Sequence, residues 1–320
     1  MLRIPSCGVW FVVWGAACLS VSLATQAVEA ASTPIYGVGV DNKIYAVDTA
    51  AQSIAFVANS LSSGVKANGF AADRMRDQLM YFGSSGDLLY YDVALTTSGT
   101  VATASAFGIT SDFPPEDAAY HADAFWYVAK GDAANNILYK APLTYSGGVP
   151  SLSGPPIEYQ LTVAGSSSGM QFGDIVVNEL TGRLYGSTTP VSGGMFFSLD
   201  MSALVAGTAN PVAVISTSNT VGLQLAFSED YSVLFGQRYI FDPLDPANPA
   251  LTSGAWYTVD PLLGAYAAIP GFITTPGMRD LAGTVAPEPG SCLLATLGAC
   301  GILLLRRRRS GGSAVIPGVW

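Results

Sequence analysis

The sequence predicts an all-β fold, a five-bladed β-propeller, and three observations predict it. A segment that reads as strand, turn, strand recurs along the chain, and a third and a fourth short strand follow each copy. The first copy of the repeat lacks an inner strand, and the last segment of the repeat region supplies one. Units of four short strands, spaced roughly 45 to 58 residues apart, are typical of propeller blades.

The recurring line consists of two strands joined by a tight turn. Apolar residues lie on both sides of a turn that contains Asp, Asn or Gly, which is the signal of a hairpin. The copies of this line are residues 68–80, 116–128, 173–186 and 223–236.

A third and a fourth strand accompany each unit. The third strands are predicted at 43–48, 87–92, 136–141, 195–200 and 255–260. The fourth strands are predicted at 53–58, 100–105, 157–162, 212–217 and 265–270. All but one of the third strands end in an aspartate that we expect to close a turn by accepting backbone N–H bonds. These aspartates are Asp48, Asp92, Asp200 and Asp260, and Ala141 breaks the pattern.

Aromatic residues recur in the second and third strands. In blades that stack side by side, such residues are expected to pack between neighbouring blades rather than to form a platform for sugars. They are Tyr36, Tyr45, Tyr90, Tyr127, Phe196, Phe235 and Tyr257.

The two ends of the repeat region complete one another. Residues 34–37 match a second strand, so the first unit lacks its inner strand, whereas residues 277–285 are an inner strand with no unit of their own. Joined, they make the fifth blade, and the closure removes the open sheet edges. We therefore expect one propeller domain at residues 33–286. A β-sandwich is the alternative, but it does not explain why the first unit lacks what the last segment supplies.

Composition and charge agree with an exported β protein. Half of the residues are hydrophobic, yet only 12% are charged. Residues 31–286 contain 9 Lys and Arg against 21 Asp and Glu, a net charge of −12, which repels nucleic acid and anionic lipid. All four cysteines lie outside this region, at Cys7, Cys18, Cys292 and Cys300, so the body has no disulfide framework and no cysteine metal site.

The N-terminus predicts a signal peptide at residues 1–30. Arg3 precedes the apolar stretch 9–24, and Val28 and Ala30 stand at the small-residue positions before a cleavage site. An uncleaved membrane anchor is the alternative.

The C-terminus predicts a transmembrane helix at residues 291–305. Its 15 apolar and small residues are fewer than the roughly 20 of a typical spanning helix. Pro289 and four arginines bracket it, and positive charge stays on the cytoplasmic side. A buried core helix is excluded as the alternative, because the arginines would follow it directly out of the core.

These features together resemble the PEP-CTERM sorting signal of Gram-negative bacteria, over residues 287–309. The matching parts are Pro287, Glu288, Pro289, the apolar helix with Gly298 and Gly301, and the cluster Arg306, Arg307, Arg308 and Arg309. The family's signal usually ends at the basic cluster, whereas this chain continues with a short tail at residues 310–320.

The resemblance implies a route and partners for the chain. Signal peptidase and an exosortase-like sorting enzyme would process it. The protein would cross the inner membrane, be anchored there transiently by its C-terminal helix, and then reach the outer surface or the extracellular matrix. The family often accompanies exopolysaccharide production, so the resemblance implies a role in a biofilm or matrix.

Polar residues occupy one shared place near the start of the predicted inner strands. They are Asp117, Asp174, Asp280 and Gln224, with Gly69 at that place in the remaining unit and Asn68 directly before it. In a propeller they would ring one mouth of the central channel. Three carboxylates and two amides could hold Ca²⁺, two of the carboxylates could cleave a glycosidic bond, or each Asp could cap its own loop.

The only histidine, His121, aligns with turn residues in the other units and is expected to be a turn residue as well. Two hypotheses for function follow. The first is an exported binding or structural module whose ligand is a polysaccharide or another surface protein, and the absence of a catalytic signature favours it. The second is a glycan-active hydrolase or lyase that uses the channel-mouth carboxylates.

Overall fold

The structure is a computed structural model of the chain, which divides into two compact units, residues 1–32 and 33–320. The described residues all belong to the second unit and are 34–61, 67–108, 115, 117–128, 136–163, 172–188, 194–217, 222–240 and 253–283. The predicted signal peptide, sorting signal and transmembrane helix lie outside them. Within these ranges, no helix is long and apolar enough to cross a membrane.

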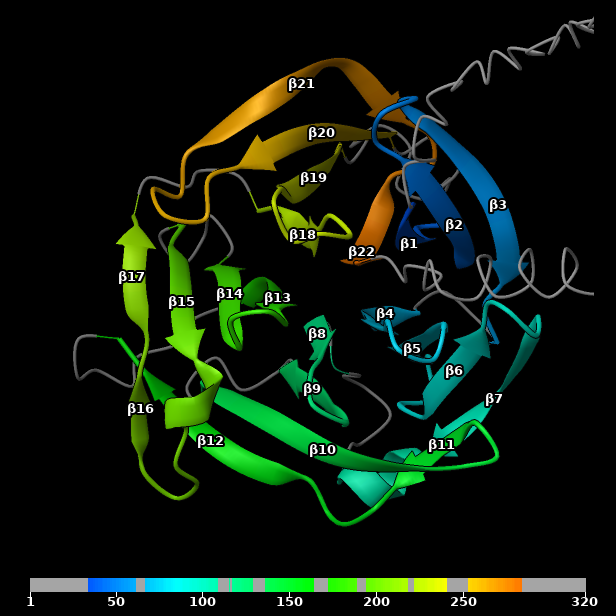
Figure 1. The fold of residues 1–320 in the computed structure, drawn as a ribbon, viewed down its shortest axis with the longest axis vertical. Coiled ribbons are helices and arrows are strands. Elements are labelled where there is room, and N and C mark those ends of the chain that lie inside the picture. The colour runs from blue at the N-terminus through cyan, green and yellow to red at the C-terminus, as the bar shows by residue number, and fades with distance from the viewer. Residues whose placement is uncertain are drawn as a thin grey trace, which may run out of the picture. The chain divides into compact units, whose positions relative to one another are not determined.

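Five blades form the described part of the chain (Figure 1). From the inside outwards, blade 1 is β22 (Met278–Ala282), β1 (Ile35–Gly39), β2 (Lys43–Asp48) and β3 (Ser53–Asn59). Blade 2 is β4 (Asn68–Asp73), β5 (Gln78–Phe82), β6 (Leu88–Asp92) and β7 (Thr97–Ala102). Blade 4 is β13 (Phe172–Asn178), β14 (Arg183–Thr188), β15 (Phe196–Asp200) and β17 (Ala213–Ser216). Blade 5 is β18 (Gln224–Phe227), β19 (Leu234–Ile240), β20 (Ser253–Val259) and β21 (Tyr266–Thr274).

Blade 3 is larger than its four-stranded neighbours. It contains β8 (Asp117–Tyr120), β9 (Ala124–Val128), β10 (Ile137–Ser146), β12 (Ile157–Thr162) and β16 (Ala209–Pro211), and β11 (Val149–Leu152) pairs with β10. The repeat pattern did not predict β11 or β16. The β10–β11 hairpin turns at Gly147 and Gly148, whose φ angles are 58° and 85°. Two successive residues with positive φ suit a tight hairpin turn, and glycine adopts them without strain.

The ring of blades closes between the two ends of the repeat region, as predicted. In Figure 1 the inner strand β22 lies beside β1, and Tyr36 pairs with Ala282 while Val38 pairs with Asp280. The inner strands contact one another around the ring in the order β4, β8, β13, β18, β22 and back to β4. The five-bladed propeller is therefore confirmed, and the β-sandwich alternative is wrong.

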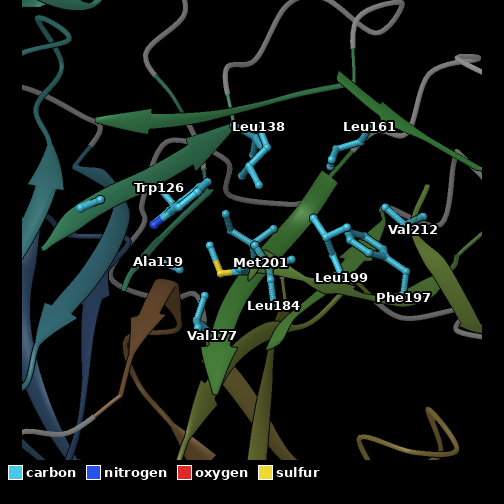
Figure 2. Close-up of a cluster of buried hydrophobic side chains, with 13 residues drawn as sticks. Ala119, Trp126, Leu138, Leu161, Val177, Leu184, Phe197, Leu199, Met201 and Val212 are labelled. Atoms are coloured by element: carbon cyan, nitrogen blue, oxygen red, sulfur yellow. The ribbon is translucent and has the colours of Figure 1, made fainter. Parts of the chain in front are cut away.

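Hydrophobic side chains fill the space between neighbouring blades. Figure 2 shows the cluster between blades 3 and 4, where Trp126 and Leu138 of blade 3 face Leu184 and Phe197 of blade 4, with Met201 among them. Burying one such large side chain contributes about 1.5–3 kcal/mol. The predicted recurring aromatic residues belong to the clusters between blades, some fully buried and some partly buried.

The turn aspartates behave as predicted. Asp48 Oδ1 accepts the N–H groups of Ala50 and Ala51 at 2.9 and 2.8 Å. Asp92, Asp200 and Asp260 accept backbone N–H groups of their own turns in the same way. These carboxylates stabilise local turns.

The propeller has two faces, which antiparallel pairing defines. We call the end at which each inner strand turns into the second strand the hairpin face. It includes the turns 74–77, 121–123 and 179–182, and also the turns between third and fourth strands, such as 93–96 and 261–263. We call the opposite end, where the inner strands begin, the loop face.

Candidate functional site

The predicted polar residues lie one on each blade, and the three carboxyl groups lie close enough to interact electrostatically. Asp117 lies on β8, Asp174 on β13, Asp280 on β22, Gln224 on β18 and Asn68 on β4. The three carboxylates are buried, with Asp174 and Asp280 fully inaccessible and Asp117 5% exposed. The ring lies at the loop-face end of the inner strands.

Asp280 joins blade 1 to blade 2. Its Oδ1 accepts the N–H of the next residue, Leu281, at 2.8 Å. Its Oδ2 accepts the N–H of Phe70 on β4 at 2.6 Å. One carboxylate thus satisfies backbone donors on two adjacent inner strands, which would otherwise be buried without partners.

Asp174 joins blade 4 to blade 5 in the same way. Its Oδ1 accepts the N–H of Ile175 at 2.7 Å, and its Oδ2 accepts the N–H of Leu225 on β18. Gln224 reaches back across the same junction, since its Nε2 donates to the carbonyl oxygen of Gly173 at 3.2 Å. The Asp174 and Asp280 carboxylates therefore bond between blades, which differs from the hypothesis that each caps a loop of its own.

Burial and mutual repulsion both act on these carboxyl groups. Burial raises the pKa of Asp174 well above its usual range, and the nearby Asp280 and Asp117 raise this pKa further. Burial and the charge of Asp117 raise the pKa of Asp280 as well. The backbone N–H groups oppose this shift, because they stabilise the ionised form.

The two amides of the ring leave oxygen atoms unpaired. Gln224 Oε1 and Asn68 Oδ1 are buried and have no hydrogen-bond partner. A cation could use such oxygens, but among the described residues no group of three His, Cys, Asp or Glu is arranged to hold a metal ion. The four carboxylate oxygens of Asp174 and Asp280 already accept N–H bonds. The Ca²⁺ site stays a prediction of the sequence.

Arg74 occupies the opposite, hairpin-face end of the channel. From the β4–β5 turn it reaches past blade 1 to blade 5, and donates to the carbonyl oxygens of Phe227, Ser228 and Glu229 at 3.3, 3.3 and 3.0 Å. Its guanidinium also lies 4.0 Å from the centre of the Tyr231 ring. A Cβ at residue 283 would clash with the Nη2 of Arg74, so glycine leaves room for the crossing.

Glu179 from blade 4 completes this group. Its carboxylate accepts a hydrogen bond from Tyr231, and burial raises its pKa, while that hydrogen bond and the charge of Arg74 lower it. Burial lowers the pKa of Arg74, and Tyr231 and Glu179 oppose that shift. Side chains from blades 2, 4 and 5 thus meet over this end of the channel.

The sequence interpretation missed the Arg74 group, although the repeat alignment contains a signal for it. Arg74, Glu179 and Glu229 each directly follow the last residue of the aligned inner-strand segment. Three charged residues at one repeat position would be brought to the same end of a channel.

A small cavity lies beneath these side chains. Its volume is about 30 Å³, and its lining comes from β4, β8, β13 and β22 together with Arg74 and Glu179. A water molecule needs roughly 10–15 Å³ of such volume, so this cavity has room for one or two. A sugar ring does not fit in it.

A second polar network links blades 2 and 3 near the hairpin face. Arg76 contacts Asp73 and Asp123, each at 2.9 Å, and stacks 3.7 Å from the Tyr145 ring centre. The Tyr145 hydroxyl donates to Asp73 at 2.8 Å, and the Arg76 guanidinium donates to the Tyr120 hydroxyl at 3.0 Å. Burial raises the pKa of Tyr120 and Tyr145 above the usual tyrosine range. This network holds two blades together.

His121 is a turn residue, as predicted. Its N–H donates to the Ala124 carbonyl at 3.0 Å, and its carbonyl accepts from the Ala124 N–H at 3.1 Å. Burial and the nearby Lys140 lower its pKa.

No protein-family model and no curated protein matches this chain. Among solved structures, the chain is similar to hydrazine synthase of Kuenenia stuttgartiensis, with 12% sequence identity and a TM-score of 0.37. The similarity covers 72% of this chain and 60% of the other. The chain thus spans less than two thirds of the length of that protein, and a likeness of this size carries no argument about function.

Proposed function

We propose that this protein is an exported, surface- or matrix-associated β-propeller that acts as a binding or structural module. The observation that carries the proposal is the use of the Asp174 and Asp280 carboxylates, which bridge blades through backbone N–H groups. Groups that hold the ring closed are poorly available for a ligand. A ligand is therefore bound on the faces of the propeller, where loops join rigid strands.

The proposed cellular location rests on the sequence alone. The signal peptide and the PEP-CTERM-like tail support export, transient anchoring in the inner membrane and sorting by an exosortase-like enzyme. The net charge of −12 over residues 31–286 disfavours polyanionic ligands, including nucleic acid. The favoured ligands are neutral or cationic polysaccharides and surface proteins with basic patches.

A glycan-active hydrolase or lyase is the second candidate, and the raised pKa values of Asp174 and Asp280 favour it. A carboxyl whose pKa is raised by burial suits a general acid. The burial of these two carboxyl groups argues against it, because a glycosidase needs room for a sugar between its carboxylates, and the oxygens of Asp174 and Asp280 already accept backbone N–H bonds between blades.

Glycan-array binding by residues 31–320, which is the chain without its predicted signal peptide, tests the two candidate functions. We expect retention on neutral or cationic glycans, no release of new reducing ends or unsaturated sugars, and unchanged retention for a folded Asp174→Asn variant. If the protein releases such products and Asp174→Asn abolishes their release, the enzyme hypothesis would replace the binding-module hypothesis.

A further inference from the structure

The most exposed large hydrophobic side chains share one face of the propeller. Among the described residues they are between 68% and 85% exposed, and they are Met75, Leu95, Leu180, Leu262 and Leu263. All five lie on turns of the hairpin face, on blades 2, 4 and 5. Apolar side chains that gather on one face mark an interaction surface more often than scattered ones do.

Turn chemistry does not account for these residues. Asp92 Oδ1 accepts the N–H of Leu95 at 2.7 Å, and Asp260 Oδ1 accepts those of Leu262 and Leu263 at 2.8 and 3.1 Å. In each case the aspartate fixes the backbone of the turn, so the leucine side chain is not needed for it. The turns hold these apolar side chains out to solvent.

The chain also leaves the propeller at this face. β22 ends at Ala282, which pairs with Tyr36 near the start of β1, so residue 283 lies at the hairpin face. Residues 284–290 separate it from the predicted membrane segment 291–305. At about 3.3–3.6 Å per residue, that connection reaches about 25 Å when fully extended. Because this connection is short, a propeller anchored by the membrane segment would turn its hairpin face toward the bilayer.

Acidic side chains on this face determine the lipid headgroups that it can approach. Asp200, Glu229, Asp230 and Asp260 are exposed on turns of the same face. Anionic headgroups are repelled by such charges, whereas zwitterionic headgroups are not. The tether keeps the surface at a high effective concentration near the membrane, so individually weak apolar contacts suffice.

We propose that the hairpin face is a membrane-contact surface, whose exposed leucine and methionine side chains enter the headgroup region of a zwitterionic bilayer while the chain is anchored. This inference rests on the proposed function, because it requires residues 291–305 to be in the membrane. It adds an orientation: the loop face, with the carboxylate ring, points away from the membrane toward its ligands.

Tryptophan quenching by brominated phosphatidylcholine tests the orientation on the full chain, reconstituted into phosphatidylcholine vesicles. Leu262→Trp and Leu180→Trp place a probe on the hairpin face. Ile273→Trp is the matched control, because Ile273 is 60% exposed but lies near the loop-face end of β21. The unsubstituted chain supplies the signal of the native tryptophans. We expect the added fluorescence at 180 and 262 to fall about twofold, with no change at 273 and less quenching when phosphatidylglycerol is included.

An alkaline carbonate wash separates the two ways in which the idea can fail. A chain that the wash removes is not anchored by its tail, which overturns the proposed address and this inference together. If the chain resists the wash but quenching is equal at 262 and 273, the proposed membrane anchoring stands and only the membrane-contact surface is overturned.

Discussion

The two ends of the central channel bury charges of opposite sign. At the loop-face end, Asp117, Asp174 and Asp280 gather like charges, and the last two accept backbone N–H groups from two blades. At the hairpin-face end, Arg74 places one cation on three backbone carbonyl oxygens. The backbone itself compensates the charge at each end, because N–H donors face the carboxylates and carbonyl acceptors face the guanidinium.

The two ends also differ in which blades they join. The Asp174 and Asp280 bridges connect neighbouring blades, whereas Arg74 connects blades 2 and 5, which are not neighbours in the ring. Losing one carboxylate bridge weakens one junction, but losing Arg74 removes a brace across the channel.

Removing β22 destroys both ends at once and has the largest expected effect. Deleting residues 277–285 removes Asp280 and Gly283, exposes the edge of β1, and uncovers the apolar side chains of blade 5 that pack against Met278 and Leu281. We expect the protein to become insoluble, and the soluble fraction after expression measures this. Deletion of residues 310–320 is the control and should leave solubility unchanged. A soluble, cooperatively melting product of the 277–285 deletion would contradict the closure.

Removing the brace affects the hairpin-face end alone. Arg74→Met keeps the length of the side chain but leaves three carbonyl oxygens and Glu179 without their cation, so we expect a loss of about 2–4 kcal/mol in the free energy of unfolding. Urea unfolding measures it. Arg238→Met, at an exposed position, is the matched control and should cost less than about 0.5 kcal/mol. Equal losses for both variants would show that Arg74 is no brace.

The loop-face end responds to pH. Because the folded-state pKa of Asp174 is raised, its contribution to stability is fully present below the unfolded value of about 3.9 and is lost as pH rises through the folded value. Asp174→Asn cannot ionise, but it leaves one N–H without an acceptor. We therefore expect the variant to be less stable than the parent at pH 4.5, and the difference in their free energies of unfolding to narrow as the pH rises toward 7.5.

Asp230→Asn is the control for this pH dependence. Hydrogen bonds from Ser232 lower the pKa of Asp230 to about 2, so its contribution to stability is present above the unfolded-state pKa of about 3.9 and is lost as pH falls from there through the folded-state value. The difference between this variant and the parent should stay constant between pH 4.5 and 7.5. Thermal melting at several pH values measures both variants, and a constant gap for Asp174→Asn as well would refute the assignment.

Calcium gives the smallest expected effect. Since the Asp174 and Asp280 oxygens already accept N–H groups, we expect millimolar Ca²⁺ or a chelator to leave the Tm unchanged for the parent and for Asp174→Asn. A Tm that rises with Ca²⁺ in the parent, and rises less in the variant, would instead establish a cation site at this end.

Particular elements show how far the sequence predicts the fold. The inner hairpins and the third strands lie where the repeats placed them, except that β10 continues to Ser146, beyond its predicted end at residue 141, and β12 has the predicted bounds. β7 begins at Thr97 rather than at residue 100, because pairing of Asp92 with Thr97 extends an edge strand into polar residues that resemble a turn. Strand β16 joins blade 3 through parallel pairing with β12, which no local pattern in 209–211 predicts.

The candidate site was predicted as a set of residues but not as a set of contacts. The repeat alignment brought Asp117, Asp174 and Asp280 to one ring. It could not show that Asp280 accepts from Phe70, because these residues are 210 positions apart and belong to different blades.

The sequence by itself determined the number of blades, the closure by the C-terminal strand and the turns closed by aspartate. These depend on local periodicity and on side chains that bond within a few residues, so contiguous sequence encodes them. Only the tertiary structure decided that the ring carboxylates bridge blades and that Arg74 spans the channel to Phe227, 153 positions away. Such contacts depend on distances between strands of separate blades, which packing sets and no single segment contains.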